Sequence, residues 1–357
     1  MPRLSFWALV SVLAPALLGG QVPDGRGETV RIVGGATAPR LLKGVYPQTT
    51  DDARVNHIEG TVLFQIVVDQ NGHPTHITLL SPLGFGLDEK ARAAVEAWEF
   101  APGMKDGKPV DVLAMVDVNF RFRDTVRNEA DRRRDSFNTA FESLKRADAN
   151  AAVINRAVET MQDLSRQEFP AAMYVVGVWE TSGEHVKGDS ADGLALIQKA
   201  AAARYGPAVY EIATRRMEGR GLPRDVEKGL DEMGQAALLG SRQAQKDLGD
   251  RYLKGDGVPR EPDRARWYFR LCAASGVALC QCRLGSWLLD APSRTEYQYV
   301  QGIAWLELAS EHGVAEAQDI LFRERAALTP TENGLANGLK AALVKAQLQR
   351  KQGLSGW

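Results

Sequence analysis

The chain has 357 residues, more than one ordinary hydrophobic core holds, so two domains or one domain with an extended array are expected. Its hydrophobic share of 44% and charged share of 25% exclude wholesale disorder and a collagen-like chain. The 44 Lys and Arg residues against 45 Asp and Glu give a net charge of -1, which argues against nucleic acid as the main partner.

The first residues have the layout of a secretory signal peptide. Arg3 supplies a positive charge, residues 6–18 form an uncharged stretch of 13 residues, and two glycines precede Gln21. A membrane-spanning helix needs roughly 17–25 apolar residues. We therefore expect residues 1–20 to be a cleaved signal peptide of an exported, soluble protein; an uncleaved N-terminal anchor is the alternative.

Residues 29–123 are predicted to form a small α+β domain in which one helix covers one side of a sheet. Residues 61–69 have the two-residue alternation of a strand, which places Val62, Phe64, Ile66 and Val68 on one face. Asn71-Gly72 follows at once, and this dipeptide favours a tight hairpin turn into a returning strand at residues 76–80.

The second half of this domain holds the helix and the longest strand. Asp88 is a plausible N-cap for the helix, and Ala91, Val95 and Trp98 have the spacing of its buried stripe. Residues 110–123 then alternate, with apolar side chains on one face. The opposite, mostly polar face carries Asp111, Leu113, Met115, Asp117, Asn119 and Arg121.

Six motifs in this order resemble the C-terminal domain of TonB-type energy transducers. The motifs are Tyr46-Pro47, Ile58-Glu59-Gly60-Thr61-Val62, Val68-Asp69-Gln70-Asn71-Gly72, Leu87-Asp88-Glu89-Lys90-Ala91, Ala97-Trp98-Glu99-Phe100-Ala101-Pro102 and Asp106-Gly107-Lys108-Pro109-Val110. The resemblance covers roughly residues 29–123.

The resemblance implies peptide capture. TonB-type domains bind a short extended segment of an outer-membrane transporter by adding it as a strand to an open sheet edge. The receiving strand follows the helix, so the resemblance places the peptide-binding edge at Asp111, Leu113, Met115, Asp117, Asn119 and Arg121. Leu113 and Met115 would grip peptide side chains. Alternatively, this strand is covered by the following helices or by a second copy of the domain in a homodimer.

The chain departs from the energy transducers ahead of this domain. Transducers have a membrane anchor and a long Pro- and Lys-rich spacer that crosses the periplasm. Here only a short linker, residues 21–28, separates the signal from the domain, and eight extended residues reach less than about 30 Å. The domain is therefore expected not to transmit force; an atypical energy transducer with a retained inner-membrane anchor is the alternative.

The second part of the chain repeats with a period near 36 residues. Gly219-Arg-Gly221-Leu-Pro223 recurs 36 residues later as Gly255-Asp-Gly257-Val-Pro259. A period in this range predicts an all-α solenoid of stacked helix pairs. The glycines that close successive units are Gly206, Gly240, Gly276 and Gly313.

These units resemble Sel-like repeats, relatives of tetratricopeptide repeats, most clearly from Ala244 to Gly276. The resemblance implies a protein-interaction scaffold with a concave face. The expected organisation is a helical hairpin linker or cap at 124–169, about four repeats within 170–313 at 170–206, 207–240, 241–276 and 277–313, and C-terminal capping helices at 314–357.

Cys272 and Cys280 bracket the turn between two neighbouring units. Some secreted Sel-like proteins have a disulfide at this spacing, so the resemblance implies a Cys272–Cys280 bond, with buried free thiols as the alternative. Cys282 stays unpaired in either case. A Cys-x-Cys without a nearby histidine is a poor zinc site, and the five histidines lack ligand spacing, so neither a metal nor another cofactor is expected.

The sequence contains neither a Gly-x-Ser-x-Gly nor a Ser-x-x-Lys motif. We therefore expect a non-enzymatic periplasmic adaptor. Its TonB-like domain would capture an extended peptide of an outer-membrane transporter or of another periplasmic protein, and its repeats would bind a second protein. A cell-wall or penicillin-interacting enzyme is the remaining alternative, which no residue supports.

Overall fold

The computed structural model of the chain describes residues 20–23, 29–32, 36–55, 58–121, 129–291 and 294–354. The predicted signal peptide therefore lies outside the described residues, apart from Gly20. The chain divides into two compact units, and each is described by itself. One unit comprises residues 3–122 and 249–353, and the other comprises residues 123–248.

The first unit holds the sheet and the C-terminal helices. Its strands are β1 (Gly20–Pro23), β2 (Thr29–Ile32), β3 (Arg40–Lys43), β4 (Gly60–Val68), β5 (Pro74–Ser81), β6 (Glu99–Ala101), β7 (Gly103–Lys105), β8 (Lys108–Val110) and β9 (Val112–Phe120). Its helices are α1 (Asp51–Val55), α2 (Leu87–Glu96), α10 (Pro262–Ala274), α11 (Ala278–Leu289), α12 (Glu296–Glu311), α13 (Ala315–Glu324) and α14 (Pro330–Leu354).

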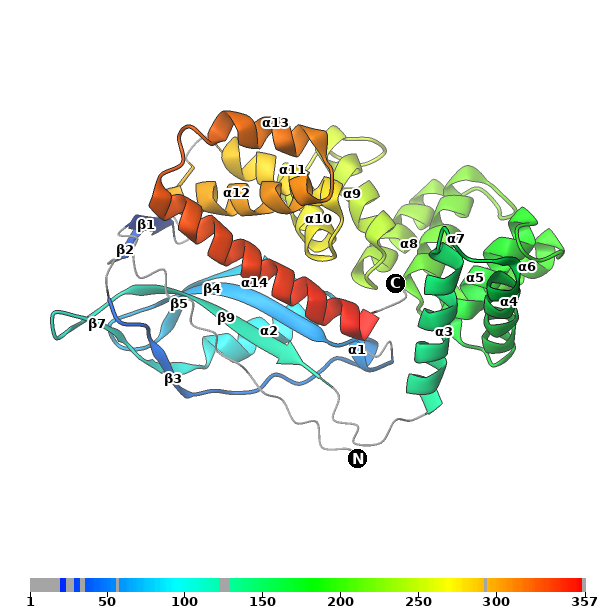
Figure 1. Ribbon diagram of the computed structural model, residues 1–357, viewed down its shortest axis with the longest axis horizontal. Helices are drawn as coiled ribbons and strands as arrows, with labels where there is room; N and C mark the ends of the chain where they lie inside the picture. Colours follow the sequence, from blue (N-terminus) through cyan, green and yellow to red (C-terminus); the bar gives the residue numbers. More distant parts are fainter. Residues whose placement is uncertain are drawn as a thin grey trace. The chain divides into compact units, whose positions relative to one another are not determined.

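The main sheet is antiparallel and has the strand order β5-β4-β9 (Figure 1). Strand β9 pairs with β4 without interruption, from Gly60 opposite Phe120 to Val68 opposite Val112. The β4–β5 pairing has two irregularities. The pairs β1–β2, β3–β6 and β7–β8 form separate two-stranded sheets.

Helix α2 begins two residues earlier than an N-cap at Asp88 would place it. Its N-cap is Gly86, in the left-handed conformation with φ 72°, and Asp88 already lies in the first turn. The Asp88 carboxylate accepts hydrogen bonds from the backbone N–H groups of Leu83 and Gly84, at 2.7 and 3.0 Å. The expected N-cap role of Asp88 is thus wrong, because its carboxylate reaches back to the loop ahead of the helix.

Both faces of the main sheet are buried. On the face toward α2, the Arg92 guanidinium lies 5.7 Å from the centre of the Phe64 ring. The opposite face of β4 consists of Thr61, Leu63, Gln65 and Val67, and these side chains are at most 3% exposed. The expectation that a helix covers only one side is therefore corrected: α14 and α12 cover the second face.

Helix α14 is much longer than the helices of the repeats, and this length lets it reach the sheet. It has 25 residues, against 10 in α13, and its N-terminus is fixed by Thr329 and Glu332, whose side chains each bond the other residue's backbone N–H. Its apolar stripe includes Ala336, Leu339 and Leu343, all buried. The predicted capping helix is thus also a cover for the sheet.

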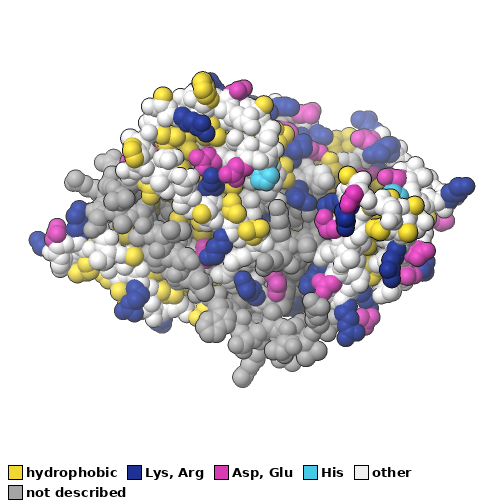
Figure 2. All heavy atoms as spheres, viewed as in Figure 1, with side chains coloured by type: hydrophobic (Ala, Val, Ile, Leu, Met, Phe, Trp, Pro, Cys, Tyr) yellow, Lys and Arg dark blue, Asp and Glu magenta, His cyan; other side chains and the backbone are white. Residues whose placement is uncertain are grey.

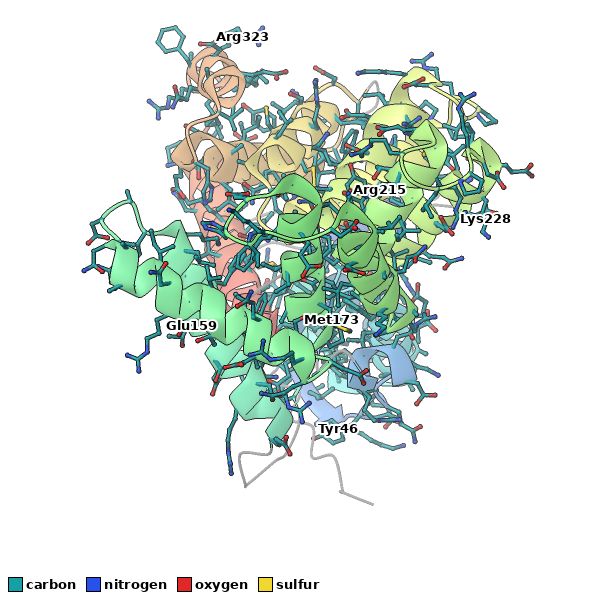
Figure 3. The ribbon with its side chains drawn as sticks, turned by 90° about the vertical axis from the view of Figure 1, so that its right-hand side faces the viewer. Tyr46, Glu159, Met173, Arg215, Lys228 and Arg323 are labelled. Carbon is teal, nitrogen blue, oxygen red and sulfur yellow. A yellow bond between two sulfur atoms is a disulfide. The ribbon has the colours of Figure 1, made fainter. Side chains whose placement is uncertain are left out.

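The second unit is a series of helices, most of them in antiparallel pairs. They are α3 (Glu129–Lys145), α4 (Ala151–Arg166), α5 (Pro170–Ser182), α6 (Ser190–Ala202), α7 (Gly206–Glu218), α8 (Val226–Leu238) and the start of α9 (Arg242–Lys254). Met173 of α5 is buried in the core that joins α3 to α7, whereas Arg215 of α7 forms a 2.7 Å ion pair with Glu211 (Figure 3).

A buried glutamine recurs at the junctions between repeats. Gln245 and Gln281 lie at the same position, 36 residues apart, and both are at most 1% exposed. Each donates its side-chain N–H to a backbone carbonyl of the preceding helix, at Ala237 and Ala273 respectively. This glutamine recurs in the sequence at the repeat period, but it was not among the residues from which the repeats were predicted.

Among the described residues, no helix combines the length and apolar character needed to cross a membrane.

Candidate functional site

Strand β9 forms one edge of the main sheet. Within the described residues it has β4 on one side and no strand on the other. It is nine residues long and its register with β4 is regular throughout. An edge strand presents every second N–H and C=O group outward, so a regular edge of this length is a ready template for another strand.

The other edge of the sheet is much less suited to strand addition. Strand β5 contains His76 with a φ of 51°, and its pairing with β4 is shifted at two places. Arg92 of α2 donates a 2.9 Å hydrogen bond to the Ile77 carbonyl. Bulges and capped carbonyls protect a sheet edge from pairing, so β9 is the better template.

The side chains of β9 that were expected to be exposed are largely covered. Leu113 is 5% exposed and packs with Val67 against Tyr297 of α12. Met115 is half-buried. Their expected role of gripping peptide side chains is therefore corrected for Leu113, because the C-terminal helices occupy this face.

Two polar residues of the same face, Asp117 and Thr61, are bound to α14. The Lys345 Nζ lies 2.8 Å from the Asp117 Oδ2, and their side chains are 45% and 8% exposed. The Thr61 hydroxyl hydrogen-bonds the side chains of Asn119 and Gln349. Of the polar side chains of β9, Asp117 thus contacts the last helix directly, and Asn119 is linked to it through Thr61 of β4.

The two ends of the edge carry opposite charges. Asp111 precedes β9 and accepts a 3.2 Å hydrogen bond from the backbone N–H of Gln70. Arg121 follows the strand and is exposed. Of the six predicted edge residues, only Arg121 is exposed, Asp111, Met115 and Asn119 are half-buried, and Leu113 and Asp117 are buried.

A buried charged cluster lies where the C-terminal end of α14 meets the sheet. Arg350 is 6% exposed and donates a hydrogen bond to the Leu83 carbonyl. Asp88 holds the neighbouring N–H groups of Leu83 and Gly84. Burial raises the pKa of Asp88 to about 6, although these two hydrogen bonds and the Arg350 charge lower it.

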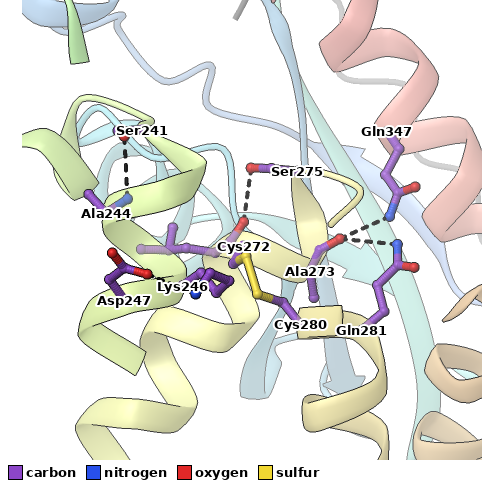
Figure 4. The surroundings of a disulfide bond; sticks show 11 residues. Ser241, Ala244, Lys246, Asp247, Cys272, Ala273, Ser275, Cys280, Gln281 and Gln347 are labelled. Atoms are coloured by element: carbon purple, nitrogen blue, oxygen red, sulfur yellow. Dashed lines mark hydrogen bonds and ion pairs between the residues drawn. A yellow bond between two sulfur atoms is a disulfide. The ribbon is translucent and has the colours of Figure 1, made fainter. Parts of the chain in front are cut away.

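A disulfide joins α10 to α11. The sulfurs of Cys272 and Cys280 are bonded, with their Cα atoms 5.7 Å apart (Figure 4). The Ala273 carbonyl beside it accepts hydrogen bonds from both Gln281 and Gln347, the latter in α14. Cys282 is a buried free thiol, and burial raises its pKa to about 11.

The described residues contain no cluster of side chains that could ligate a metal ion. No group of three or more His, Cys, Asp or Glu side chains in these parts of the chain could hold a metal ion.

On the face shown in Figure 2, basic and acidic side chains are interspersed and do not form a patch of one charge.

The sequence did not reveal four residues that shape this site. Tyr297, Lys345, Gln349 and Arg350 all come from helices that were expected only to continue or cap the array. The one available signal was the length of the helical pattern after Thr329-Pro330, which exceeds that of any repeat helix.

Two family models match the chain. Residues 44–122 match the Gram-negative bacterial TonB protein C-terminal domain. Residues 170–205, 206–241, 242–277 and 278–314 each match the Sel1 repeat. The predicted resemblances to both families, and the predicted fold of a small sheet domain followed by a helical solenoid, are confirmed. Both families consist of non-catalytic interaction modules.

A curated relative matches the sheet domain. The chain is 36% identical over 85 residues to protein TonB of Vibrio cholerae serotype O1. The match covers 23% of this chain and 35% of the relative, so the chain spans about a third of that protein's length.

Solved structures are similar to part of the chain. A Sel1 repeat protein from Oxalobacter formigenes is 26% identical, with 47% of this chain and 49% of that chain covered and a TM-score of 0.43. An immunity protein from Pseudomonas aeruginosa is 19% identical, with 63% and 84% covered and a TM-score of 0.40.

Proposed function

Because the chain carries a TonB C-terminal-type domain and four Sel1 repeats, we propose that it is a non-enzymatic adaptor that binds two proteins. The sheet domain captures an extended segment by strand addition at β9, and the repeats hold a second protein. The compartment is the periplasm, where the N-terminal segment would export the chain and where a Cys272–Cys280 bond persists.

The observation that carries this proposal is the contrast between the two edges of the main sheet. Strand β9 is regular over nine residues and has no neighbouring strand within the described residues. Strand β5 is bulged and capped by Arg92. An extended segment would gain a continuous row of backbone hydrogen bonds at β9 alone.

Capture at this edge depends on backbone rather than on the side chains of β9. Leu113 and Asp117 face the helices of the same unit and are buried. The captured segment can therefore vary in sequence along most of its length, as is typical when main-chain hydrogen bonds supply the affinity. A segment of an outer-membrane transporter and a β9 strand of a second copy both meet this requirement.

Hydrogen exchange tests the proposal directly. The full chain is mixed with peptides selected from a displayed library of random sequences, each nine residues long to match β9. We expect every second backbone amide of β9 to gain protection, because only alternate N–H groups point outward. Replacing Met115 by proline should abolish binding, and replacing it by alanine should not.

Selected peptides that bind without changing the exchange of β9 would contradict strand addition. Protection of β9 that depends on protein concentration and needs no peptide would instead identify pairing between two copies.

A further inference from the structure

Two arginines of α10 lie one helical turn apart, on the same side of the helix. They are Arg266 and Arg270, and both belong to the third Sel1 repeat. Side chains four residues apart in a helix are neighbours, and like charges at this spacing destabilise the helix. The positive charge of Arg266 indeed acts on Arg270. The helix by itself therefore gains no stability from this pair.

Arg266 already has partners. Its Nη2 lies 3.1 Å from the Asp263 Oδ1, and its Cζ lies 4.7 Å from the centre of the Trp287 ring of α11. Its Nε is buried and has no hydrogen-bond partner among the described residues. The ion pair and the ring hold this guanidinium in place, so we do not count it as a free donor.

Arg270 has no such partner. In the parts of the chain that the structure describes, no carboxylate or carbonyl pairs with it, and it is half-buried. Burial, and to a smaller extent the charge of Arg266, lower the pKa of its guanidinium to about 10. The group is still charged at neutral pH. Arg270 is thus a partly desolvated cation that lacks an anion.

The repeat fold does not require arginine at these two positions. In the preceding repeat, 36 residues earlier, the corresponding residues are Leu230 and Gly234. A Cβ added at Gly234 would have nothing within 4 Å, so this is not a packing position of that repeat. The arginine pair is therefore a feature of the third repeat alone and needs a reason other than folding.

We propose that Arg270, beside Arg266 and Trp287, forms a carboxylate-binding site through which the repeats hold an acidic segment of a second protein. This inference rests on the part of the proposed function that assigns a second protein to the repeats. A guanidinium is planar and can donate to both oxygens of a carboxylate at once. A carboxylate bound to Arg270 would supply the missing anion and offset the repulsion from Arg266.

A covalent bond holds the two helices that line this site. Cys272, two residues after Arg270, is bonded to Cys280 of α11, the helix that carries Trp287 (Figure 4). The disulfide limits how far α10 and α11 can separate at the end where Arg270 lies. A site that is already ordered before the ligand arrives loses less conformational entropy on binding.

The test uses the full chain and a displayed library of nine-residue peptides with proline at every third position. Proline at this spacing prevents the peptides from pairing as a strand with β9 in any register. We expect the wild-type protein to enrich Asp or Glu at one position. Changing that residue to Asn or Gln should weaken binding about tenfold or more, the range for a hydrogen bond to a charged group.

Arg270→Met and Arg264→Met are the matched variants. Arg264 is on the same helix, lies 4.3 Å from the centre of the Tyr252 ring and pairs with Glu261 at 3.7 Å. Arg264→Met removes the same charge and should keep the acidic preference. Arg270→Met should lose it. Because Arg270→Met also removes a desolvated charge without a partner, it should raise the urea denaturation midpoint of the peptide-free protein.

Nuclear magnetic resonance of protein with ¹⁵N-labelled arginine observes the site directly. The Arg270 Nε–H signal is the one that is missing in Arg270→Met. The selected acidic peptide should shift this signal with saturation, and its Asn or Gln counterpart should not. A shift caused by inorganic phosphate at constant ionic strength, with none caused by the acidic peptide, would refute a protein carboxylate as the ligand.

The outcomes separate this inference from the proposed function. Peptides that bind wild type and Arg270→Met with the same preferences would refute the role of Arg270, while protein binding by the repeats would stand. Absence of any binder in this library would overturn both. Loss of the acidic preference in Arg270→Met but not in Arg264→Met, together with the shift of the Arg270 signal, supports the carboxylate site.

Discussion

Gly72 is fixed by its surroundings in the hairpin between β4 and β5. Its φ is +84°, and an added Cβ would lie 1.9 Å from the Phe100 carbonyl oxygen. The Gly72 carbonyl also accepts a 2.8 Å hydrogen bond from the Phe100 N–H. The Asn71-Gly72 turn therefore also fastens the hairpin to β6.

Gly72→Ala is expected to lower the free energy of unfolding by about 3 kcal/mol. About 1 kcal/mol comes from the left-handed backbone, and the remainder from displacing β6. Gly107→Ala is the control, because Gly107 has a similar φ of +76° but nothing within 4 Å of its Cβ. Urea denaturation of both variants measures the difference, and equal losses would show that the contact with Phe100 is unimportant.

Asp88 makes the stability of the sheet unit depend on pH. Burial raises its pKa from 3.8 to about 6 in the folded protein. The folded state therefore binds a proton more tightly than the unfolded state. The stability that Asp88 contributes is present at pH below about 4 and is lost as pH rises through about 6.

Asp88→Asn should remove this part of the pH dependence. The raised pKa corresponds to about 3 kcal/mol between pH 4 and pH 7. Denaturation midpoints in urea at pH 4, 5, 6 and 7 should therefore vary less in the variant than in the wild type. Asp51→Asn, at a carboxyl whose side chain is 90% exposed, should retain the wild-type profile.

At the scale of elements, the disulfide ties two helices of adjacent repeats. Cys272 lies in the buried last turn of α10 and Cys280 lies in the first turn of α11, with eight residues of sequence separation. A loop this short restricts the unfolded chain by about 2.5 kcal/mol in the chain-entropy model. The neighbouring Ala273 carbonyl then connects the same junction to α14.

Cys272→Ala/Cys280→Ala should lower the melting temperature of the unit and abolish its response to a reducing agent. Alanine is chosen because both sulfurs are buried, so that no polar group is introduced. Cys282→Ala should keep the response, since this thiol is free. A wild-type melting temperature that does not change on reduction would refute the proposed bond.

Helix α14 connects the repeats to the sheet through polar contacts as well as apolar ones. Its apolar stripe joins the core of α12 and α13, while Lys345 and Gln349 bind β9 and β4. Asp117 and Thr61 both have partners on α14, so separating the surfaces would leave these buried polar groups without them. These polar contacts therefore determine which residues of α14 lie against which residues of β4 and β9.

At the scale of the whole molecule, the compact units do not follow the order of the domains in sequence. The sheet domain forms one unit with residues 249–353, and the boundary of the other unit falls within α9. The last two Sel1 repeats thus share a core region with the TonB-type domain, because α12 and α14 bury the sheet's second face.

Two separate polypeptides should reproduce this unit. Residues 29–123 and 242–354, produced together, are expected to co-purify and to yield a folded complex. Residues 242–329, which lack α14, should not retain the sheet domain, since the buried side chains of Asp117 and Thr61 would lose their partners Lys345 and Gln349. Co-purification that is independent of α14 would refute its role as the cover.

Much of the fold was readable from the sequence because its signals are local. The alternation of residues 110–123, the Asn71-Gly72 turn and the 36-residue period each depend on neighbours in the chain. They determined the strands, the helix pairs and the candidate edge strand. The family resemblances followed from the same short motifs.

What covers the second face of the sheet was decided only by the tertiary structure. The pattern of α14 indicates a buried stripe, but a stripe does not say which surface it meets. The contact of Lys345 with Asp117 joins residues 228 positions apart, and no local sequence pattern indicates that these two residues meet. The burial of Leu113 and Asp117 on β9, and with it the reliance of the candidate site on backbone, follows from that long-range packing.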